Sequence, residues 1–410
     1  MVRPRCGDGQ VTLKGLGGVA ALVMLAATAC ASSGSGSAGQ PSPNLSSAIS
    51  PDSKAADLRV RLDLLLGEHV LVVAKISLAA GGNRTDEYKG YTGLLRTNAD
   101  DLKAVIATAF GASTSARFAS IWEAQNGNLV DYTIGQVTHN AKKSNGAVSG
   151  LVNGFIPQFA QLIASVTEIP QSSVTQLSTE HIRMTRAMID DQVARNYTKM
   201  YVDLRSAHAN TSRLGDALAL SIVQKFPDKF PGDPSNKATD LRASLNRLLQ
   251  EHAYLATMTT GALAAARNAE QAAAQAALAG NAGDLSRVLG VLLGGSMATR
   301  FDQMWSAKDA ELVIYSGSTD AGRRQNARGD LTTTYVSQFV RYVHDSTGIS
   351  ESSMLPPTQD QVQATIRVID DQRSSSLERV AAEDRTAAAG MAAIADLITT
   401  ALVARMPAKF

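Results

Sequence analysis

Cysteine is nearly absent from this chain of 410 residues, which contains only Cys6 and Cys30. Both lie within the first 30 residues, in a segment with the features of an export signal. The sequence after this segment therefore cannot form a disulfide, a cysteine-ligated zinc site or a catalytic cysteine centre. We expect the domains to be stabilised by core packing alone.

Aromatic residues are also few, and charge of one sign never accumulates. The chain has 39 Lys and Arg against 37 Asp and Glu, with no long basic or acidic block. A nucleic-acid partner would require a basic stripe, so we predict none. No nucleophile elbow, H-E-x-x-H motif or Walker loop occurs in the sequence. We therefore predict that the protein is not an enzyme.

The first 30 residues are predicted to be a lipoprotein signal peptide. A positively charged start precedes an apolar run over residues 16–29 that is too short to span a bilayer as a helix. The run ends in small residues directly before Cys30, as in a bacterial lipobox, so Cys30 is the predicted lipidation site. An ordinary secretory signal cleaved near Ala29 is the alternative. Residues 31–54 are rich in Ser, Gly and Pro and are predicted to form a flexible tether.

The sequence after the tether contains two similar halves. Leu65-Leu66-x-Glu68-His69 recurs as Leu248-Leu249-x-Glu251-His252, and further matches keep this offset of 183 before it falls to 180. A period this long indicates a duplicated domain and not a solenoid. A proline-rich stretch over residues 227–234 marks the boundary. We therefore divide the chain into a first half, residues 55–231, and a second half, residues 232–410.

Both halves have helical periodicity, which predicts an all-α fold. We expect two tandem up-and-down bundles of four to six helices, each half being long enough for a core of its own. In the first half the predicted helices cover residues 55–80, 84–110, 114–141, 147–167, 172–193 and 197–226. The predicted breaks include Asn145-Gly146, with Pro157 kinking the fourth helix or marking its true start. In the second half they include Gly294-Gly295, Gly329 and Pro356-Pro357.

Several polar residues occur at matching positions in both halves. We expect most of them to form a shared polar core. The arginine of the Arg-Phe pair is expected to pair with Asp101/Asp284 or Asp190/Asp370 and so fix the helix register, and an anionic ligand at this arginine is the alternative. The matching residues are Glu68/Glu251, His69/His252, Asn98/Asn281, Asp101/Asp284, Arg117/Arg300, Tyr132/Tyr315, Asp190/Asp370 and Arg205/Arg385.

Histidines of the first half form a candidate metal site. His69 lies on an apolar helix face and should point inward, where a carboxylate or a carbonyl would hold it as a structural histidine. The alternative is a copper or zinc site made by Glu68, His69, His181 and His208, or a haem ligand. The second half lacks two of these histidines, so the alternative applies to the first half only. No Glu-x-x-His motif occurs, which excludes a carboxylate-bridged di-iron site.

The repeated motifs resemble those of an uncharacterised group of secreted bacterial helical-bundle proteins. The resemblance covers both halves and rests on L-x-x-L-L-x-E-H, N-x-x-D-L, R-F-x-x-x-W, I-D-D-Q and Q-K-F-P-D-K-F. Some members carry a fused domain similar to the N-terminal domain of copper amine oxidases, which implies no oxidase activity here. The resemblance also implies a histidine shortly after the tryptophan, where this chain has Gln125.

These observations predict a non-enzymatic lipoprotein of the cell envelope. It would be attached through Cys30 to the outer face of the cytoplasmic membrane. An unknown envelope protein or a small ligand is the expected partner, and no cofactor is expected. A metal- or haem-binding bundle with its ligand in the first half is the alternative function.

Overall fold

The computed structural model describes residues 50–410, and every regular element in that range is a helix. The all-α prediction is therefore confirmed for this part of the chain. The predictions for the signal peptide, for Cys30 and for most of the tether fall outside the described residues.

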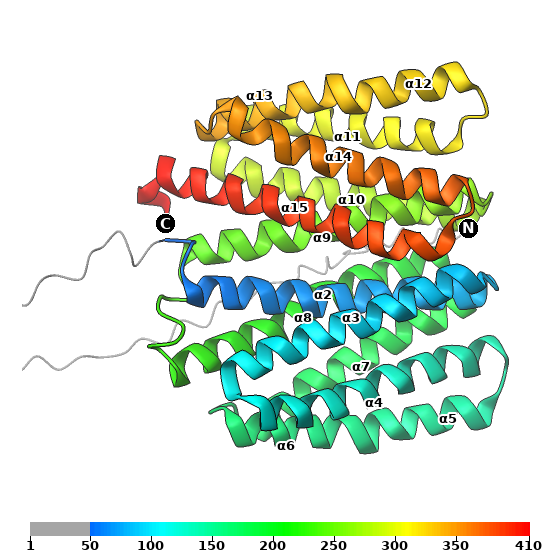
Figure 1. The fold of residues 1–410 in the computed structure, drawn as a ribbon, viewed down its shortest axis with the longest axis vertical. Helices are drawn as coiled ribbons and strands as arrows, with labels where there is room; N and C mark the ends of the chain where they lie inside the picture. Colours follow the sequence, from blue (N-terminus) through cyan, green and yellow to red (C-terminus); the bar gives the residue numbers. More distant parts are fainter. Residues whose placement is uncertain (1–49) are drawn as a thin grey trace, which may run out of the picture. The chain divides into compact units, whose positions relative to one another are not determined.

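The two halves contain the same series of helices in the same order (Figure 1). In the first half these are α2 (Lys54–Gly81), α3 (Thr85–Phe110), α4 (Ala112–Val137), α5 (Ala141–Ser149), the π-helical turn η1 (Gly150–Phe155), α6 (Ile156–Val166), α7 (Gln171–Val193) and α8 (Tyr197–Lys225). In the second half they are α9 (Lys237–Ala264), α10 (Asn268–Leu293), α11 (Gly295–Gly317), α12 (Ala321–Gly329), η2 (Asp330–Tyr335), α13 (Val336–Thr347), α14 (Glu351–Arg373), α15 (Leu377–Arg405) and the 3-10 turn η3 (Pro407–Lys409).

Equivalent capping residues start the first helix of each half. The Ser53 side chain accepts a hydrogen bond from the Ala56 backbone N–H at 3.1 Å, and the Asn236 side chain accepts one from Thr239 at 2.7 Å. Each cap satisfies one of the backbone donors that a helix start leaves free. The same local device therefore sets the start of α2 and of α9.

Two predicted helix breaks are wrong. The chain turns at residues 138–140, where His139 has a positive φ of 53°, and Asn145-Gly146 lies inside α5. Pro356 and Pro357 lie inside α14, which begins earlier, at Glu351. Local propensity predicted breaks at these two positions, but the helices continue through both. Gly329, in contrast, is the last residue of α12, where the chain passes directly into η2.

A π-helical turn interrupts the fourth helical stretch of both halves. Pro157 lies in the first turn of α6, which follows η1 directly. This agrees with the prediction that Pro157 marks the start of a helix. The same turn nevertheless occurs at η2, where Ser337 occupies the equivalent position. Proline is therefore not the cause of the interruption. Both turns place an aromatic residue, Phe155 or Tyr335, against the tryptophan of their own half, with ring centroids 6.0 and 6.2 Å apart.

The apolar core continues from one half into the other. α2 and α9 contact each other at the centre, and α3 packs on α15 as α10 packs on α8 (Figure 1). The approach of α3 to α15 is close: a Cβ atom on Gly90 would lie 2.6 Å from the backbone oxygen of Glu378. Residues 50–410 accordingly belong to one unit.

Three stretches are long and apolar enough to cross a membrane, judged by length and composition alone: Lys54–Gly81, Ala141–Val166 and Leu377–Arg405. In the first of these, α2, 83% of the most apolar window is buried inside the protein. Its apolar character is thus matched by the helices that surround it.

Candidate functional site

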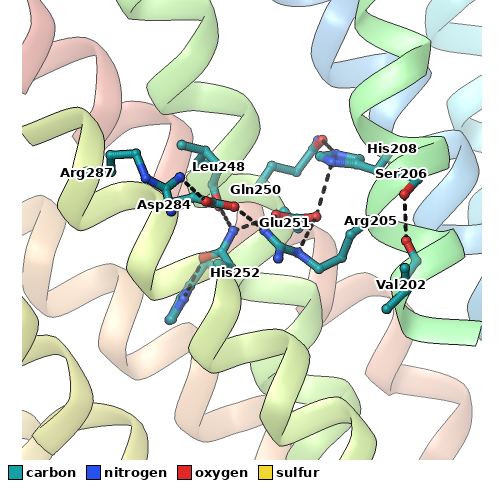
Figure 2. A network of polar contacts seen from close by, with 11 residues as sticks. Val202, Arg205, Ser206, His208, Leu248, Gln250, Glu251, His252, Asp284 and Arg287 are labelled. Atoms are coloured by element: carbon teal, nitrogen blue, oxygen red, sulfur yellow. Dashed lines mark hydrogen bonds and ion pairs between the residues drawn. The ribbon is translucent and has the colours of Figure 1, made fainter. Parts of the chain in front are cut away.

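Arg205 in α8 connects the two halves through an ionic cluster. Its guanidinium donates to both carboxylate oxygens of Glu251 at 3.2 Å and to Asp284 at 2.6 Å (Figure 2). The Glu251 side chain is only 2% exposed, and Arg205 is 24% exposed. Burial opposes ionisation of Asp284, but hydrogen bonds from Arg205 and Arg287 outweigh it and lower the pKa of Asp284. This cluster holds α8 against α9 and α10.

The equivalent residues form the reciprocal cluster. Arg385 in α15 lies 3.3 Å from Glu68 in α2 and also donates to Asp101 in α3. Burial raises the pKa of Glu68, while Arg385 acts in the opposite direction. Each half thus supplies one arginine and accepts the arginine of the other half.

A second reciprocal pair lies near the starts of α2 and α9. Arg59 lies 2.6 Å from Asp240 of the second half, and Arg242 lies 2.6 Å from Asp57 of the first. Each arginine also binds an aspartate of its own half, Asp216 or Asp396. Such reciprocity is the property of an isologous two-fold interface, here formed within one chain.

The shared asparagines support the same clusters. Asn98 donates to Glu68 at 2.8 Å, and Asn281 donates to Glu251 at 2.7 Å. Each also donates to a backbone carbonyl at 2.9 Å, of Leu65 or of Leu248. Three of the eight matching pairs, Glu68/Glu251, Asp101/Asp284 and Arg205/Arg385, therefore join the halves, and the asparagines hold their glutamates in place.

The predicted pairing of Arg300 is wrong. Arg300 is exposed and binds Asp345 at 2.7 Å, and Arg117 is also exposed, so neither belongs to a polar core. Asp101 and Asp284 are taken by the arginines of the opposite half. The other expected partners bind tyrosines at 2.6 Å, Tyr132 to Asp190 and Tyr315 to Asp370. Sequence positions alone do not distinguish pairing within a half from pairing between halves.

The four candidate metal ligands of the first half are not all brought together. His69 and His181 lie side by side, with ring centroids 5.5 Å apart. Glu68 points to Asn98, Tyr254 and Arg385. His208 faces the other half, 3.3 Å from Gln250 and 3.9 Å from Glu251. Within residues 50–410, no group of three or more His, Cys, Asp or Glu side chains is placed to hold a metal ion.

A polar centre lies inside each half, around its tryptophan. In the first half, the Gln125 amide nitrogen is 2.8 Å from His181 Nε2 and 3.5 Å from His69 Nε2. Burial lowers the pKa of both imidazoles, that of His181 to about 4. Both histidines are therefore neutral at physiological pH.

The second half builds this centre from charged residues. Lys308 Nζ lies 2.5 Å from His252 Nε2 and 3.2 Å from Asp309; Lys308 and His252 are buried, and Asp309 is half-buried. Trp305 Nε1 lies 3.2 Å from His252 Nδ1. Sequence reasoning missed Lys308 and Asp309. The sequence does contain a signal that could have identified them. Lys308 and Asp309 align with Gln125 and Asn126, and both pairs lie one helical turn after the tryptophan of their half.

A buried ion pair between α2 and α15 also joins the halves, and it has no counterpart at the matching positions of the duplication. Lys75 in α2 lies 2.9 Å from Asp384 in α15, with side-chain exposures of 3% and 0%. Tyr91 donates to the same carboxylate, and Lys75 also contacts Thr257 at 3.1 Å. The positions equivalent to Lys75, Asp384 and Tyr91 are Met258, Leu204 and Ala274. This pair was also missed by sequence reasoning.

Asp63 is a buried acid with no hydrogen-bond partner for Oδ1 in the described part of the chain. Burial and the neighbouring Asp216 raise its pKa well above the ordinary 3.8. The second half has Asn246 at the same place, which donates to the Arg242 carbonyl at 3.0 Å and to Asp396 at 2.8 Å. A protonated Asp63 is the neutral counterpart of this asparagine.

We therefore expect Asp63→Asn to stabilise the protein at neutral pH by about 1 kcal/mol or more, because each unit by which folding raises the pKa of an acid costs about 1.4 kcal/mol. As the pH rises above 3.8, the unfolded chain releases the Asp63 proton while the folded state keeps it, so wild-type stability falls. The variant does not titrate there, and its advantage should vanish below pH 3.8. Urea unfolding of both proteins across this range tests the prediction; an equal advantage at every pH would contradict it.

No protein-family model, no curated protein and no solved structure matches this chain.

Proposed function

We propose that this protein is a non-enzymatic module of the cell envelope, lipid-anchored at Cys30, that presents one rigid helical unit to a partner. The supporting observation is the use of the polar residues common to both halves. Arg205 and Arg385 join the halves through reciprocal ionic clusters, and Arg59 and Arg242 repeat the arrangement.

The clusters give this unit a fixed internal geometry. Ionic groups with low exposure tolerate little displacement, because a separated buried charge loses its partner without regaining water. The continuous apolar core adds to this constraint. A fixed arrangement of two halves suits a scaffold that holds a constant surface towards an envelope protein or a small ligand.

The anchor is tested by replacing Cys30 with serine. Wild-type protein should enter the detergent phase on phase partitioning of cell membranes, and Cys30→Ser protein should move to the aqueous phase, because the lipid is the proposed attachment. Cys6→Ser is the matched control, since Cys6 lies in the segment that the signal assignment removes. Retention of the Cys30→Ser protein in the detergent phase would contradict the proposal.

A further inference from the structure

The second half carries a cation of its own beside its buried histidine. The Lys308 ammonium lies 2.5 Å from His252 Nε2 and 3.7 Å from the centre of the Trp305 ring. The Asp309 carboxylate, 3.2 Å away, balances the charge. An imidazole lone pair, a carboxylate and an aromatic face thus surround one positive charge.

In the first half the same position has no cation. Gln125 replaces Lys308 and Asn126 replaces Asp309, so the positive charge and its counter-ion are both missing. A second imidazole is present instead, because His181 stands where the other half has Gln361. Both imidazole Nε2 atoms face the Gln125 amide. The tryptophan is present in both halves, and the ring centroid of Trp122 lies 5.2 Å from that of His69.

The hydrogen bonding of this first-half centre is incomplete. Four buried polar atoms there lack a partner among residues 50–410: Nδ1 of His69, Nδ1 of His181, Oε1 of Gln125 and Nε1 of Trp122. In the second half both nitrogens of His252 have partners: Nε2 accepts from Lys308, and Nδ1–H donates to Asn281 Oδ1 at 3.2 Å. Gln125 Oε1 is the acceptor in this set, and a cation would complete it; the Nδ1–H groups and the indole N–H are donors that a cation does not satisfy.

We propose that the first half binds one soft monovalent cation, Cu⁺ or Ag⁺, between Nε2 of His69 and Nε2 of His181. The cation occupies the position that Lys308 Nζ takes in the second half. Imidazole is a favourable ligand for copper, and the face of Trp122 adds cation–π stabilisation. Rotation of the Gln125 amide turns its oxygen towards the ion.

The charge of the donor set selects a monovalent ion. His69, His181 and Gln125 are all neutral donors, and Asn126 provides no counter-charge. A divalent ion such as Zn²⁺ would leave two uncompensated charges in a dry interior. The Gln125 amide nitrogen lies 2.8 Å from His181 Nε2 and 3.5 Å from His69 Nε2, so ion binding requires this amide to turn and both imidazoles to close to the ~2.0 Å of a metal–imidazole bond.

Silver binding tests the proposal directly. The full chain is used with Cys6→Ser and Cys30→Ser, which removes both thiols, and Ag⁺ binding is measured by equilibrium dialysis. We expect one tight equivalent of Ag⁺, and of Cu⁺ under anaerobic conditions, with no comparable binding of Zn²⁺. In a Trp305→Phe background, the bound ion should quench the fluorescence of Trp122.

His181→Gln introduces the residue that the other half already has at this position, so the fold should be preserved. It should weaken Ag⁺ binding by at least about 100-fold, the upper range for losing even an outer-shell partner. His344→Gln, at an exposed histidine of the second half, is the matched control and should bind as the wild type does. Absence of tight Ag⁺ binding in the wild type, or unchanged binding in His181→Gln, would overturn the proposal and favour a buried water molecule.

A gain of binding gives an independent test. The triple variant Lys308→Gln, Asp309→Asn, Gln361→His makes the second-half centre equal to the first at these positions. We expect its Ag⁺ stoichiometry to rise from one to two, with quenching of Trp305 as well as Trp122. Circular dichroism establishes that the variant is folded; a folded triple variant that still binds one equivalent would contradict the assigned donors.

Discussion

Arg205→Ala should lower the free energy of unfolding by about 3 kcal/mol, because it leaves the Glu251 carboxylate buried without its counter-ion. The hydrogen bond from Asn281 to Glu251 remains, which keeps the loss towards the lower end for a broken buried pair. Arg385→Ala should have a similar effect through Glu68, which keeps its bonds to Asn98 and Tyr254. Urea unfolding monitored by circular dichroism measures both losses.

Arg287→Ala is the matched control for this experiment. Arg287 binds the same Asp284 at 2.5 Å, but its side chain is 72% exposed. An exposed ion pair contributes about 0–1 kcal/mol, so this variant should remain close to the wild type. Equal losses for Arg205→Ala and Arg287→Ala would mean that the inter-half cluster does not contribute more than an ordinary surface pair.

The pattern of repeated residues was sufficient to predict the helical class and most helix bounds. Apolar positions recur with helical spacing, and glycines such as Gly111 and Gly294 end helices at equivalent places with φ of 87° and 89°. The errors at Asn145-Gly146 and Pro356-Pro357 share one cause. Sequence reasoning weighed the local cost of these residues, whereas packing against the neighbouring helices decided whether the helix continued.

The pairing of the shared charges could not be predicted in the same way. Because both halves contain Glu68/Glu251 and Arg205/Arg385, pairing within a half and pairing between halves satisfy the same sequence pattern. Only the placement of α3 on α15 and of α8 on α10 selects the second. An internal duplication therefore identifies the residues of such an interface without showing that an interface exists.

Of the four residues proposed from the sequence as metal ligands, the structure brings His69 and His181 together. Glu68 could not join His69, because adjacent helix residues point about 100° apart. His208 lies on the face of α8 that contacts α9, a contact with no local sequence signal. The residues that differ between the halves, Gln125 and Lys308, carry more information about this site than those that match.

Lys75→Met should be among the most destabilising single substitutions in the chain, costing about 3–5 kcal/mol. It removes the ammonium that neutralises Asp384, whose side chain is fully buried, and leaves only Tyr91 to contact the carboxylate. Methionine is the residue that the other half has at this position, Met258, so loss of shape is a minor part of the cost.

Replacing the whole cluster should reverse this loss. Lys75→Met combined with Asp384→Leu and Tyr91→Phe removes every charge and leaves no hydroxyl without a partner, as the apolar equivalents Met258 and Leu204 do in the other half. Buried ion pairs are often no more stabilising than apolar residues of similar volume, so the triple variant should equal the wild type or exceed it by about 1–4 kcal/mol. Urea unfolding of the single, double and triple variants measures the coupling between the sites. A triple variant as unstable as Lys75→Met alone would show that the ion pair itself stabilises the contact between α2 and α15, and that its apolar counterpart cannot replace it.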